Sequence, residues 1–498
     1  MSPVNYPELL KLALPEIIVV LVALLVLAVD VLTMRGVPVR MRFGIGAMIA
    51  AAGCAAAIVW MLLFPEHASA LQGMLVVDPL TQLVKMVVLA LAAFTVWLSV
   101  DADFTEHVGE YLALILLATV GMLFLVSAED LLMVFVALEL TSLSLYILTA
   151  FNKHSIRSAE AALKYFLFGG MSAAFLLFGF SLVYGATGTT SLRQIALALA
   201  DRGLDPLLVV ALVMVIVGFG FKVAAVPFHL WAPDAYEGAP TPSAAFIASG
   251  SKVASFFILA KLMLLSFAGV AGSGAWHHYV GGWVPVVAIA AGLSMILGNL
   301  GALAQTSVKR LLAYSAIAHA GYMLVAVLAH DPQALAALVF YAATYGVTII
   351  GAFGVVAVVE RGMGDDRLTS FAGLSRRSPL VAFCMFIFML SLAGIPPLAG
   401  FFGKFYVFAA AVQNGAANLG LLWLVILAIA LSAVSLYYYL QVLKQIYVVA
   451  VPESTQPLPV SAATKIVLAI LAGLTLLFGC FPDLLVGRLV DALKLSGF

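Results

Sequence analysis

The chain alternates long apolar runs with short polar or charged segments. Many runs reach about 18 residues or more, the length at which an α-helix crosses the hydrocarbon core of a bilayer. Backbone polar groups cannot meet water there, so such runs must fold as helices, and the pattern predicts an all-α polytopic membrane protein. We expect about fourteen spans, at residues 10–33, 43–64, 79–100, 111–127, 131–151, 161–184, 206–231, 241–266, 283–303, 308–329, 333–358, 380–411, 420–447 and 463–485.

The span at 380–411 is too long to cross the membrane as one straight helix. Its length of about 32 residues would extend roughly 48 Å, against a hydrocarbon core of about 30 Å. The run contains Pro396 and Pro397 between Gly394 and Gly400. Proline removes a backbone donor and clashes with the preceding turn, so we expect a broken helix.

The span at 206–231 has a similar interruption, Pro227, with Gly218 and Gly220 upstream. The fourth to eighth spans and the ninth to thirteenth spans form units of five helices each. Because five is odd, consecutive units cross the membrane in opposite senses, and the two interrupted spans are fourth in their units. The pattern predicts two inverted repeats with a broken helix in each, an arrangement that points to a transport site.

These units define four predicted segments. The first contains the three N-terminal helices, the next two are the inverted repeats, and the last contains the fourteenth helix. Their boundaries are residues 1–105, 106–270, 271–450 and 451–498.

An even number of spans places both termini on the same side of the membrane. Lysines and arginines gather in the loops after odd-numbered spans, whereas loops after even-numbered spans hold only Arg193 and Arg202. The positive-inside rule therefore places both termini on the non-cytoplasmic side. The first apolar segment has no basic leader and no clear cleavage site, so we expect a retained helix and not a signal peptide.

Composition supports this class and narrows the function. Of 498 residues, 64% are hydrophobic and 10% are charged, whereas soluble domains carry about 25% charged residues. The formal net charge is zero, which gives no general attraction for nucleic acid. The three cysteines are far apart and show no metal-ligand or disulfide spacing. We therefore expect no metal site and no nucleic-acid partner.

Five ionisable residues lie near the centres of predicted spans: Glu139, Lys222, Lys252, His319 and Lys404. We call this set the lateral charge line. A charged group at mid-membrane costs about 2.5–3.5 kcal/mol on insertion scales, and such residues usually mark ion or proton pathways. Desolvation brings lysine toward a working proton affinity, and histidine titrates near neutrality. The alternative for each is a structural ion pair or a satisfied core histidine.

Other ionisable residues are weaker candidates. His229 either caps carbonyls at the predicted break or relays protons, and Lys164 lies near the inner end of its span. Lys261 is on the helix face opposite Lys252 and near a span end, where its side chain can snorkel. We expect Lys85 and Asp30 to be anchors at span ends.

Four stretches resemble a known family. They are LELTSLSLYIL around Glu139, GFGFKVAAVPFHLWAPDAYEGAPTP around Lys222, KRLLAYSAIAHAGYMLVA around His319 and LAGIPPLAGFFGKFYVF around Lys404. They are similar to the antiporter-like membrane subunits of proton-pumping NADH–quinone oxidoreductase, respiratory complex I. The resemblance covers essentially the whole chain. The SLSLY sequence and a lysine at position 404 favour one type of subunit over the type that carries glutamate there.

The resemblance implies a role for each candidate. Glu139 would be the charge partner of Lys222, the central lysine on a broken helix, and Lys404 would be the terminal lysine toward the outer exit. The linking residues along the axis would be His229, Lys252 and His319, with Lys164 assisting at the inner side. The implied fold has about fourteen helices with two inverted five-helix repeats.

The resemblance also implies partners and a location. This chain would bind no cofactor, while NAD, FMN, iron–sulfur clusters and quinone would belong to other subunits. Its partners would be other membrane-arm subunits, the lipid bilayer and protons, in a bacterial inner membrane. The alternative of the same class is a subunit of a multisubunit sodium/proton antiporter. A purely structural membrane subunit and a quinone-binding subunit are further alternatives.

Overall fold

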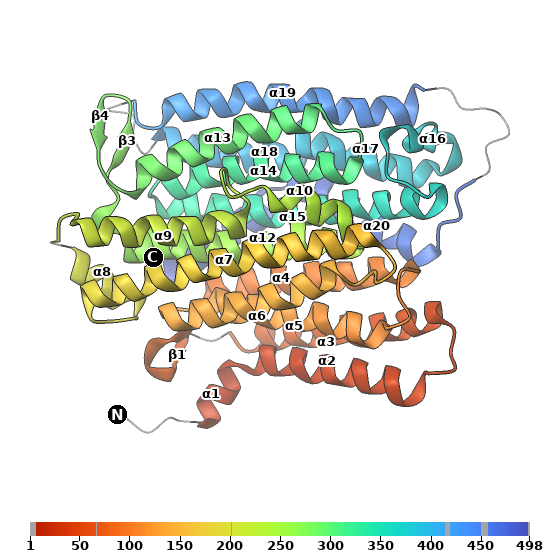
Figure 1. The fold of residues 1–498 in the computed structure, drawn as a ribbon, viewed down its shortest axis with the longest axis horizontal. Helices are drawn as coiled ribbons and strands as arrows, with labels where there is room; N and C mark the ends of the chain where they lie inside the picture. Colours follow the sequence, from red (N-terminus) through yellow and green to blue (C-terminus); the bar gives the residue numbers. More distant parts are fainter. Residues whose placement is uncertain (1–5, 66, 201, 414–418, 450–456, 497–498) are drawn as a thin grey trace.

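A computed structural model describes residues 6–65, 67–200, 202–413, 419–449 and 457–496. The described residues form a bundle of helices that run side by side along a common direction (Figure 1). Two short antiparallel hairpins connect helices at one end of the bundle. In the first, β1 (Ala68–Ala70) pairs with β2 (Leu75–Val77); in the second, β3 (Ser273–Ala275) pairs with β4 (His278–Val280).

The helices follow one another with short connections. Before the first predicted repeat lie α1 (Tyr6–Leu12), α2 (Leu14–Thr33), α3 (Val39–Leu63) and α4 (Pro79–Leu98). The region of the first repeat holds α5 (Val108–Ser127), α6 (Leu131–Thr149), α7 (Ile156–Thr187), α8 (Leu192–Leu199), α9 (Pro206–Val223), α10 (Trp231–Gly238), α11 (Thr241–Ala248) and α12 (Gly250–Lys261).

The region of the second repeat holds α13 (Trp283–Leu303), α14 (Val308–Leu328), α15 (Pro332–Met363), α16 (Leu374–Arg377), α17 (Pro379–Ala393), α18 (Ala399–Gln413) and α19 (Leu422–Tyr447), followed by α20 (Ala462–Cys480) and α21 (Asp483–Ser496). Short turns complete the described part: η1 (Leu71–Gly73), η2 (Ser99–Asp101), η3 (Leu262–Ser266, a π-helix), η4 (Ala268–Val270) and η5 (Leu368–Phe371).

The predicted number of spans is confirmed. Among the described residues, 13 helical segments are long and apolar enough to cross a membrane. The pair α17 and α18 supplies one more crossing, because neither half is long enough alone. The all-α membrane class is therefore correct, and the boundaries between the predicted repeats stay a prediction.

The break in the seventh span begins earlier than the proline that predicted it. Helix α9 ends at Val223, and Ala224 adopts a left-handed conformation with φ of 58°. The Trp231 indole N–H donates to the Phe221 carbonyl at 3.0 Å, and the backbone N–H of Val226 donates to Ser294 Oγ at 2.9 Å. Backbone groups freed by the break are thus satisfied within the protein, as a bilayer requires.

The twelfth span breaks in the same way. Helix α17 ends at Ala393, and Gly394 takes φ of 85°, a conformation that glycine adopts without strain. The backbone N–H of Gly400, in the first turn of α18, donates to Ser391 Oγ at 3.1 Å. The prediction of one broken helix in each half of the chain is confirmed.

A further break was missed. We expected one continuous helix over 241–266, but α11 stops at Ala248 and α12 starts at Gly250. Ser249 between them has φ of −115° and ψ of −82°, and its hydroxyl donates to the Ala245 carbonyl at 2.7 Å. A serine hydroxyl that bonds back to the preceding turn offers the backbone an alternative to the helical ladder, and this kinks the span.

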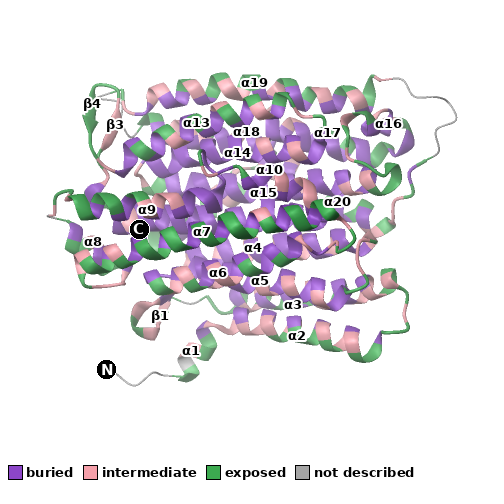
Figure 2. Ribbon diagram, viewed as in Figure 1, coloured by how far each residue is buried: buried purple, intermediate pink, exposed green. Residues whose placement is uncertain are grey.

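The centre of the bundle is formed by α12, α14 and α15, which are buried on almost every side. Figure 2 shows buried residues concentrated in the middle of the molecule and exposed residues along its outer helices. Helix α15 contacts α11, α12, α14, α17 and α18. The charged residues of α12 and α14 are therefore shielded from lipid by the protein itself.

Both ends of the described chain lie at one end of the bundle. Helix α1 contacts β1, whose hairpin leads into the start of α4. Near the other terminus, Ser496 Oγ accepts a hydrogen bond from the backbone N–H of Leu80, also at the start of α4 (Figure 1). This confirms the even number of crossings, while the side of the membrane stays a prediction.

Lys85 and Asp30 are not solvated anchors, so that expectation was wrong. Lys85 is 1% exposed, and its ammonium lies 2.7 Å from Glu16 Oε1. Asp30 is 4% exposed and accepts two hydrogen bonds from Arg42, at 2.7 and 2.6 Å, and one from the backbone N–H of Gly109. Each charge is stabilised by a partner on a neighbouring helix, which sequence position alone did not reveal.

We predict that the Glu16–Lys85 pair contributes stability only as a pair. Lys85→Met leaves a buried, unpaired carboxylate, which typically costs about 3–5 kcal/mol. Glu16→Leu combined with Lys85→Met removes both charges and should recover most of that loss. Thermal unfolding of the purified, detergent-solubilised complex measures both variants. Equal destabilisation by the single and double variants would show that the pair does not act as a unit.

Candidate functional site

Glu139 and Lys222 form the first part of the lateral charge line. Glu139 lies on α6 and Lys222 on α9, with 3.8 Å between Glu139 Oε1 and Lys222 Nζ. The ammonium also donates to Ser142 Oγ at 2.5 Å, one turn after Glu139 on α6. The Lys222 side chain is 7% exposed and that of Glu139 is 27% exposed. The lysine is thus sequestered, while its carboxylate partner reaches the surface of the chain.

The break in the seventh span places Lys222 at a helix terminus. Lys222 belongs to the last turn of α9, directly before the left-handed Ala224. A helix carries partial negative charge at its C-terminus, which favours a cation there. Part of the cost of burying the ammonium is therefore offset by the helix end that the break creates.

Lys252 lies in the first turn of α12, just after the break at Ser249. It is 2% exposed, and its ammonium donates to the carbonyl of Ala316 on α14 at 2.5 Å. The same ammonium lies 5.9 Å from the ring centroid of Tyr345 on α15. No carboxylate forms an ion pair with it among the described residues, so proton release would leave no unpaired anion behind.

His319 lies on α14, one turn after Ala316, and is 2% exposed. Its Nδ1 is 2.7 Å from the hydroxyl of Tyr341, and its Nε2 is 3.1 Å from the hydroxyl of Tyr439. A neutral imidazole has one donor and one acceptor nitrogen, and each hydroxyl can take either role. Both ring nitrogens can therefore exchange protons without a rotation of the ring.

Lys404 lies in α18 and is 5% exposed. Its ammonium donates to the carbonyls of Leu392 and Ala393, each at 3.1 Å, and to Ser432 Oγ at 2.8 Å. Lys404 follows the break in the twelfth span, and its side chain folds back to the end of α17, because the terminal carbonyls of α17 attract the cation.

In both repeats an ammonium thus lies at the C-terminal end of the helix that precedes the break, although the two lysines come from opposite sides of their breaks. Lys222 precedes its break and sits in the last turn of α9, whereas Lys404 follows its break and reaches back to α17. A cavity of about 680 Å³ between α18 and α19 adjoins Lys404. The second ammonium is therefore next to open space, whereas the first is enclosed by α6.

The lateral charge line falls into two groups. Glu139 and Lys222 form an ion pair on α6 and α9. The charges of Lys252 and Lys404 both interact with the His319 imidazole. The ring of Tyr322 lies 5.0 Å from the Lys404 ammonium and 5.7 Å from the His319 ring. Helices α9 and α12 are in contact, which brings the two groups onto adjacent helices.

The other two candidates lie beside this line. His229 is 8% exposed within the break, and its Nδ1 has no hydrogen-bond partner among the described residues. Lys164 lies on α7 with its side chain 41% exposed, and it forms ion pairs with Glu160 at 2.7 Å and Asp234 at 2.8 Å. The linking role of His229 and the assisting role of Lys164 stay predictions.

Sequence reasoning missed a charged cluster on α10, directly after the first break. Asp234 and Glu237 each accept from Arg310 at 2.8 Å, and Asp234 also binds Lys164. The available signal was the acidic sequence PDAYEG after the proline, read together with the basic pair at the start of α14. Lys261 was also misjudged: it is fully buried and lies 3.3 Å from Glu129 Oε1, so it does not snorkel.

Comparison with known proteins places this geometry in context. A family model described as "NADH:quinone oxidoreductase/Mrp antiporter, TM" matches residues 128–435. The chain is 54% identical over 494 residues to "NADH-quinone oxidoreductase subunit N 2" of Acidobacterium capsulatum, with 97% of this chain and 99% of that protein covered.

Solved structures share the fold. A chain of the respiratory complex I from Thermus thermophilus with bound aureothin superposes with a TM-score of 0.77 at 35% identity, covering 95% of this chain and 99% of that chain. A chain of the Mrp complex from Dietzia sp. superposes with a TM-score of 0.80 at 21% identity, covering 98% of both chains. The second likeness concerns the fold alone.

Proposed function

The chain belongs to the subunit N family of proton-translocating NADH–quinone oxidoreductase, and from this premise we propose that its lateral charge line is the route that protons take. The observation that supports the route most strongly is the pair Glu139–Lys222 at the end of a broken helix, with Ser142 as a second acceptor for the ammonium. The lysine at position 404 and the SLSLY sequence, which favoured one type of subunit, agree with this family.

The proposed cycle begins with Glu139 and Lys222. While the carboxylate is near, its charge holds the proton on Lys222; when the carboxylate loses that influence, burial favours release. The proton then passes to Lys252, moves through His319 and its tyrosine partners, and reaches Lys404 beside the cavity. Each lysine alternates between ammonium and neutral amine as it binds the proton and passes it on.

This chain performs the transfer without redox chemistry of its own. NAD, FMN, iron–sulfur clusters and quinone belong, in this proposal, to other subunits of the complex, and the neighbouring membrane-arm subunits are its partners. Quinone reduction elsewhere supplies the energy. The protein spans the bacterial inner membrane, and the basic loops after odd-numbered spans support an orientation with both termini on the non-cytoplasmic side.

The antiporter alternative has weaker support. The likeness to the Mrp chain is at 21% identity and concerns the fold, whereas identity to a subunit N reaches 54% over nearly the full length of both chains. Purification of the complex and identification of its co-purifying subunits separates the two readings. NADH-dehydrogenase subunits are expected; small antiporter subunits would overturn the assignment to complex I.

Substitutions at Glu139 test whether its charge tunes Lys222. Glu139→Asp keeps the charge and should retain part of the pumping activity, whereas Glu139→Gln should retain much less. NADH-driven quenching of a pH-sensitive dye in membrane vesicles measures both. Equal activity of the glutamine variant and the unchanged protein would show that the charge has no role.

A further inference from the structure

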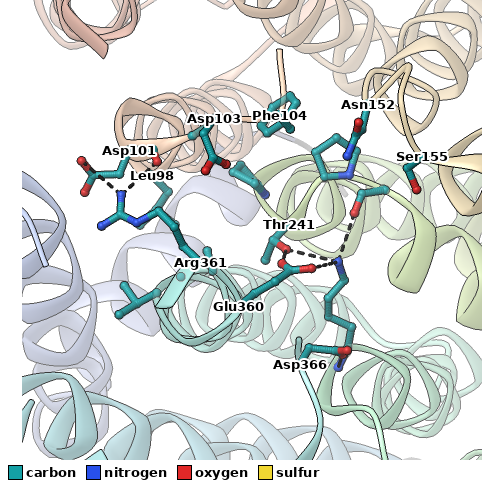
Figure 3. A pocket seen from close by; sticks show the side chains of 18 of the residues that line it. Leu98, Asp101, Asp103, Phe104, Asn152, Ser155, Thr241, Glu360, Arg361 and Asp366 are labelled. Carbon is teal, nitrogen blue, oxygen red and sulfur yellow. Dashed lines mark hydrogen bonds and ion pairs between the residues drawn. The ribbon is translucent and has the colours of Figure 1, made fainter. Parts of the chain in front are cut away.

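A polar pocket of about 480 Å³ opens among the loops that follow odd-numbered spans, the side predicted to face the cytoplasm. Figure 3 shows its charged and polar lining. The lining includes Asp101 and Asp103 after α4, Asn152 and Ser155 before α7, Gly238 and Thr241 around the start of α11, Lys309 at the start of α14, Glu360 and Arg361 near the end of α15, and Asp365 and Asp366 after it. The pocket therefore faces water at one end and the buried helices α11, α14 and α15 at the other.

The floor of the pocket is a hydrogen-bonded triad of Lys309, Thr241 and Glu360; Figure 3 shows Thr241 beside Glu360. The Lys309 ammonium, on a residue that is 4% exposed, donates to Thr241 Oγ1 at 3.2 Å, to Glu360 Oε1 at 3.1 Å and to the Ala239 carbonyl at 3.3 Å. Thr241 donates to the second carboxylate oxygen of Glu360. The Glu360 side chain is 37% exposed, so this carboxylate joins the wet pocket to the buried lysine.

Charged side chains at the rim of the pocket are held by hydrogen bonds and ion pairs. The hydrogen bond from Ser370 holds the pKa of Asp365 below its ordinary value, so this carboxylate stays ionised at neutral pH. Arg361 donates to the Asp101 carbonyl at 2.9 Å and lies 3.5 Å from its carboxylate. Asp365 and Asp101 thus have partners of their own, and Glu360 is the carboxylate of the lining that binds the buried Lys309 ammonium.

Two buried tyrosine hydroxyls lie between this floor and the lateral charge line. Tyr236 is fully buried and Tyr345 is 3% exposed, and neither hydroxyl has a hydrogen-bond partner among the described residues. Buried polar atoms without partners are uncommon and call for an explanation. The two phenol groups are also electrostatic neighbours.

Their positions lead from the pocket to Lys252. Tyr236 on α10 directly precedes Glu237, a residue of the pocket lining, and its ring centroid is 6.0 Å from that of Phe353 on α15. Phe353 lies about halfway along α15 between Glu360 and Tyr345, roughly 10–12 Å from each by helix rise. The Tyr345 ring lies 5.9 Å from the Lys252 ammonium and 5.0 Å from the His319 ring.

We propose that this pocket is the chamber through which protons enter from the side of the membrane that carries the basic loops. Glu360 is the first proton acceptor, and the hydroxyls of Tyr236 and Tyr345 are steps toward Lys252. The inference rests on the proposed function, because the pocket would supply protons to the lateral charge line. A proton from pocket water binds the Glu360 carboxylate and weakens its bond to Lys309. It passes along water and the two hydroxyls, each of which receives one proton and gives one on, and binds the neutral Lys252 amine.

The tyrosines offer the sharpest test. A structural role of their hydroxyls predicts lower stability of the phenylalanine variants, whereas a role in proton transfer predicts normal assembly with slower pumping. Removal of an unpartnered buried hydroxyl should leave stability unchanged or raise it. Tyr345→Phe and Tyr236→Phe should therefore assemble normally, yet each should slow NADH-driven proton pumping in vesicles at least about fivefold. Tyr184→Phe, on the exposed face of α7, is the matched control. Unchanged pumping in both variants would overturn the hydroxyl steps.

Glu360 is tested by chemical rescue. Glu360→Gln should slow pumping by a similar factor, and millimolar formate, a small weak acid that carries protons into such a pocket, should restore part of the rate. Glu106→Gln removes an exposed carboxylate from the same side and should behave like the unchanged protein. A slow Glu360→Gln variant that formate does not restore would assign Glu360 a structural role and overturn the entry chamber.

This design separates the entry route from the route across the membrane. Lys222→Ala should be slow with and without formate, because Lys222 lies outside the entry route and formate cannot replace its ammonium in the lateral charge line. If Lys222→Ala pumps normally, the proposed function fails whatever the pocket variants show. If Lys222→Ala fails while Tyr236→Phe, Tyr345→Phe and Glu360→Gln pump at the unchanged rate, only the entry chamber is contradicted.

Discussion

Lys222→Ala is expected to reduce NADH-driven proton pumping by about tenfold or more, since a positioned proton-transfer group typically contributes that much or more to a rate. The alanine removes the ammonium that Glu139 and Ser142 hold at the end of α9. It also leaves the helix terminus without its cation. Dye quenching in inverted membrane vesicles, with NADH oxidation recorded in parallel, measures the loss.

The control for this variant is a lysine outside the lateral charge line. Lys465 lies exposed at the start of α20, and Lys465→Ala removes the same charge without touching the buried groups. It should pump and assemble as the unchanged protein does. If both variants lose pumping equally, general disturbance of the complex, and not the position of Lys222, would explain the result.

Lys404→Ala is the second substitution with a large expected effect. Its ammonium binds the final carbonyls of α17 and Ser432 of α19, next to the cavity between α18 and α19. Without it the line has no terminal proton carrier, so pumping should slow, again by about tenfold. Electron transfer should slow only as far as it is coupled to pumping.

Lys404→Glu helps to separate charge from proton exchange. A carboxylate also binds and releases protons, so this variant should retain some pumping, although its negative charge no longer suits the C-terminal end of α17. Proton transfer and NADH oxidation are recorded together in both Lys404 variants. Unchanged pumping in Lys404→Ala with normal assembly would show a structural charge and place the exit elsewhere.

Much of this architecture could be predicted from the sequence because bilayers restrict what a chain can do. Apolar runs of sufficient length must be helices, and prolines within them must interrupt the hydrogen-bond ladder. The breaks near Pro227 and Pro396 followed directly from these rules. The break at Ser249 did not, because a serine–glycine sequence is compatible with an unbroken helix and only the structure shows the Ser249 hydroxyl bonded back to the Ala245 carbonyl.

The residues of the lateral charge line were also recognisable, because a charge within an apolar run is conspicuous. Apart from the pairing of Glu139 with Lys222, which the family resemblance implied, their partners were not recognisable. The tyrosines on either side of His319 come from α15 and α19, far away in sequence. The direction of the Lys404 side chain depends on carbonyls across a break. Lys85 looked like a span-end anchor because its partner, Glu16, lies on a different helix.

The entry pocket could not be predicted for a similar reason. It is assembled from the ends of helices and loops whose charges, taken separately, look like ordinary solvated loop residues. Lys309 and Glu360 are 51 positions apart in the chain. Only the fold shows that Lys309 points inward from the start of α14 and meets Glu360 at the end of α15.

The central claim is that Lys222 must release its proton as well as bind it. Lys222→Arg tests this most directly, because arginine keeps the positive charge at the end of α9 but does not deprotonate in proteins. With assembly verified, NADH-driven dye quenching in inverted vesicles should fall to the level of Lys222→Ala. Full pumping by the arginine variant would contradict the account, since a fixed charge would then suffice.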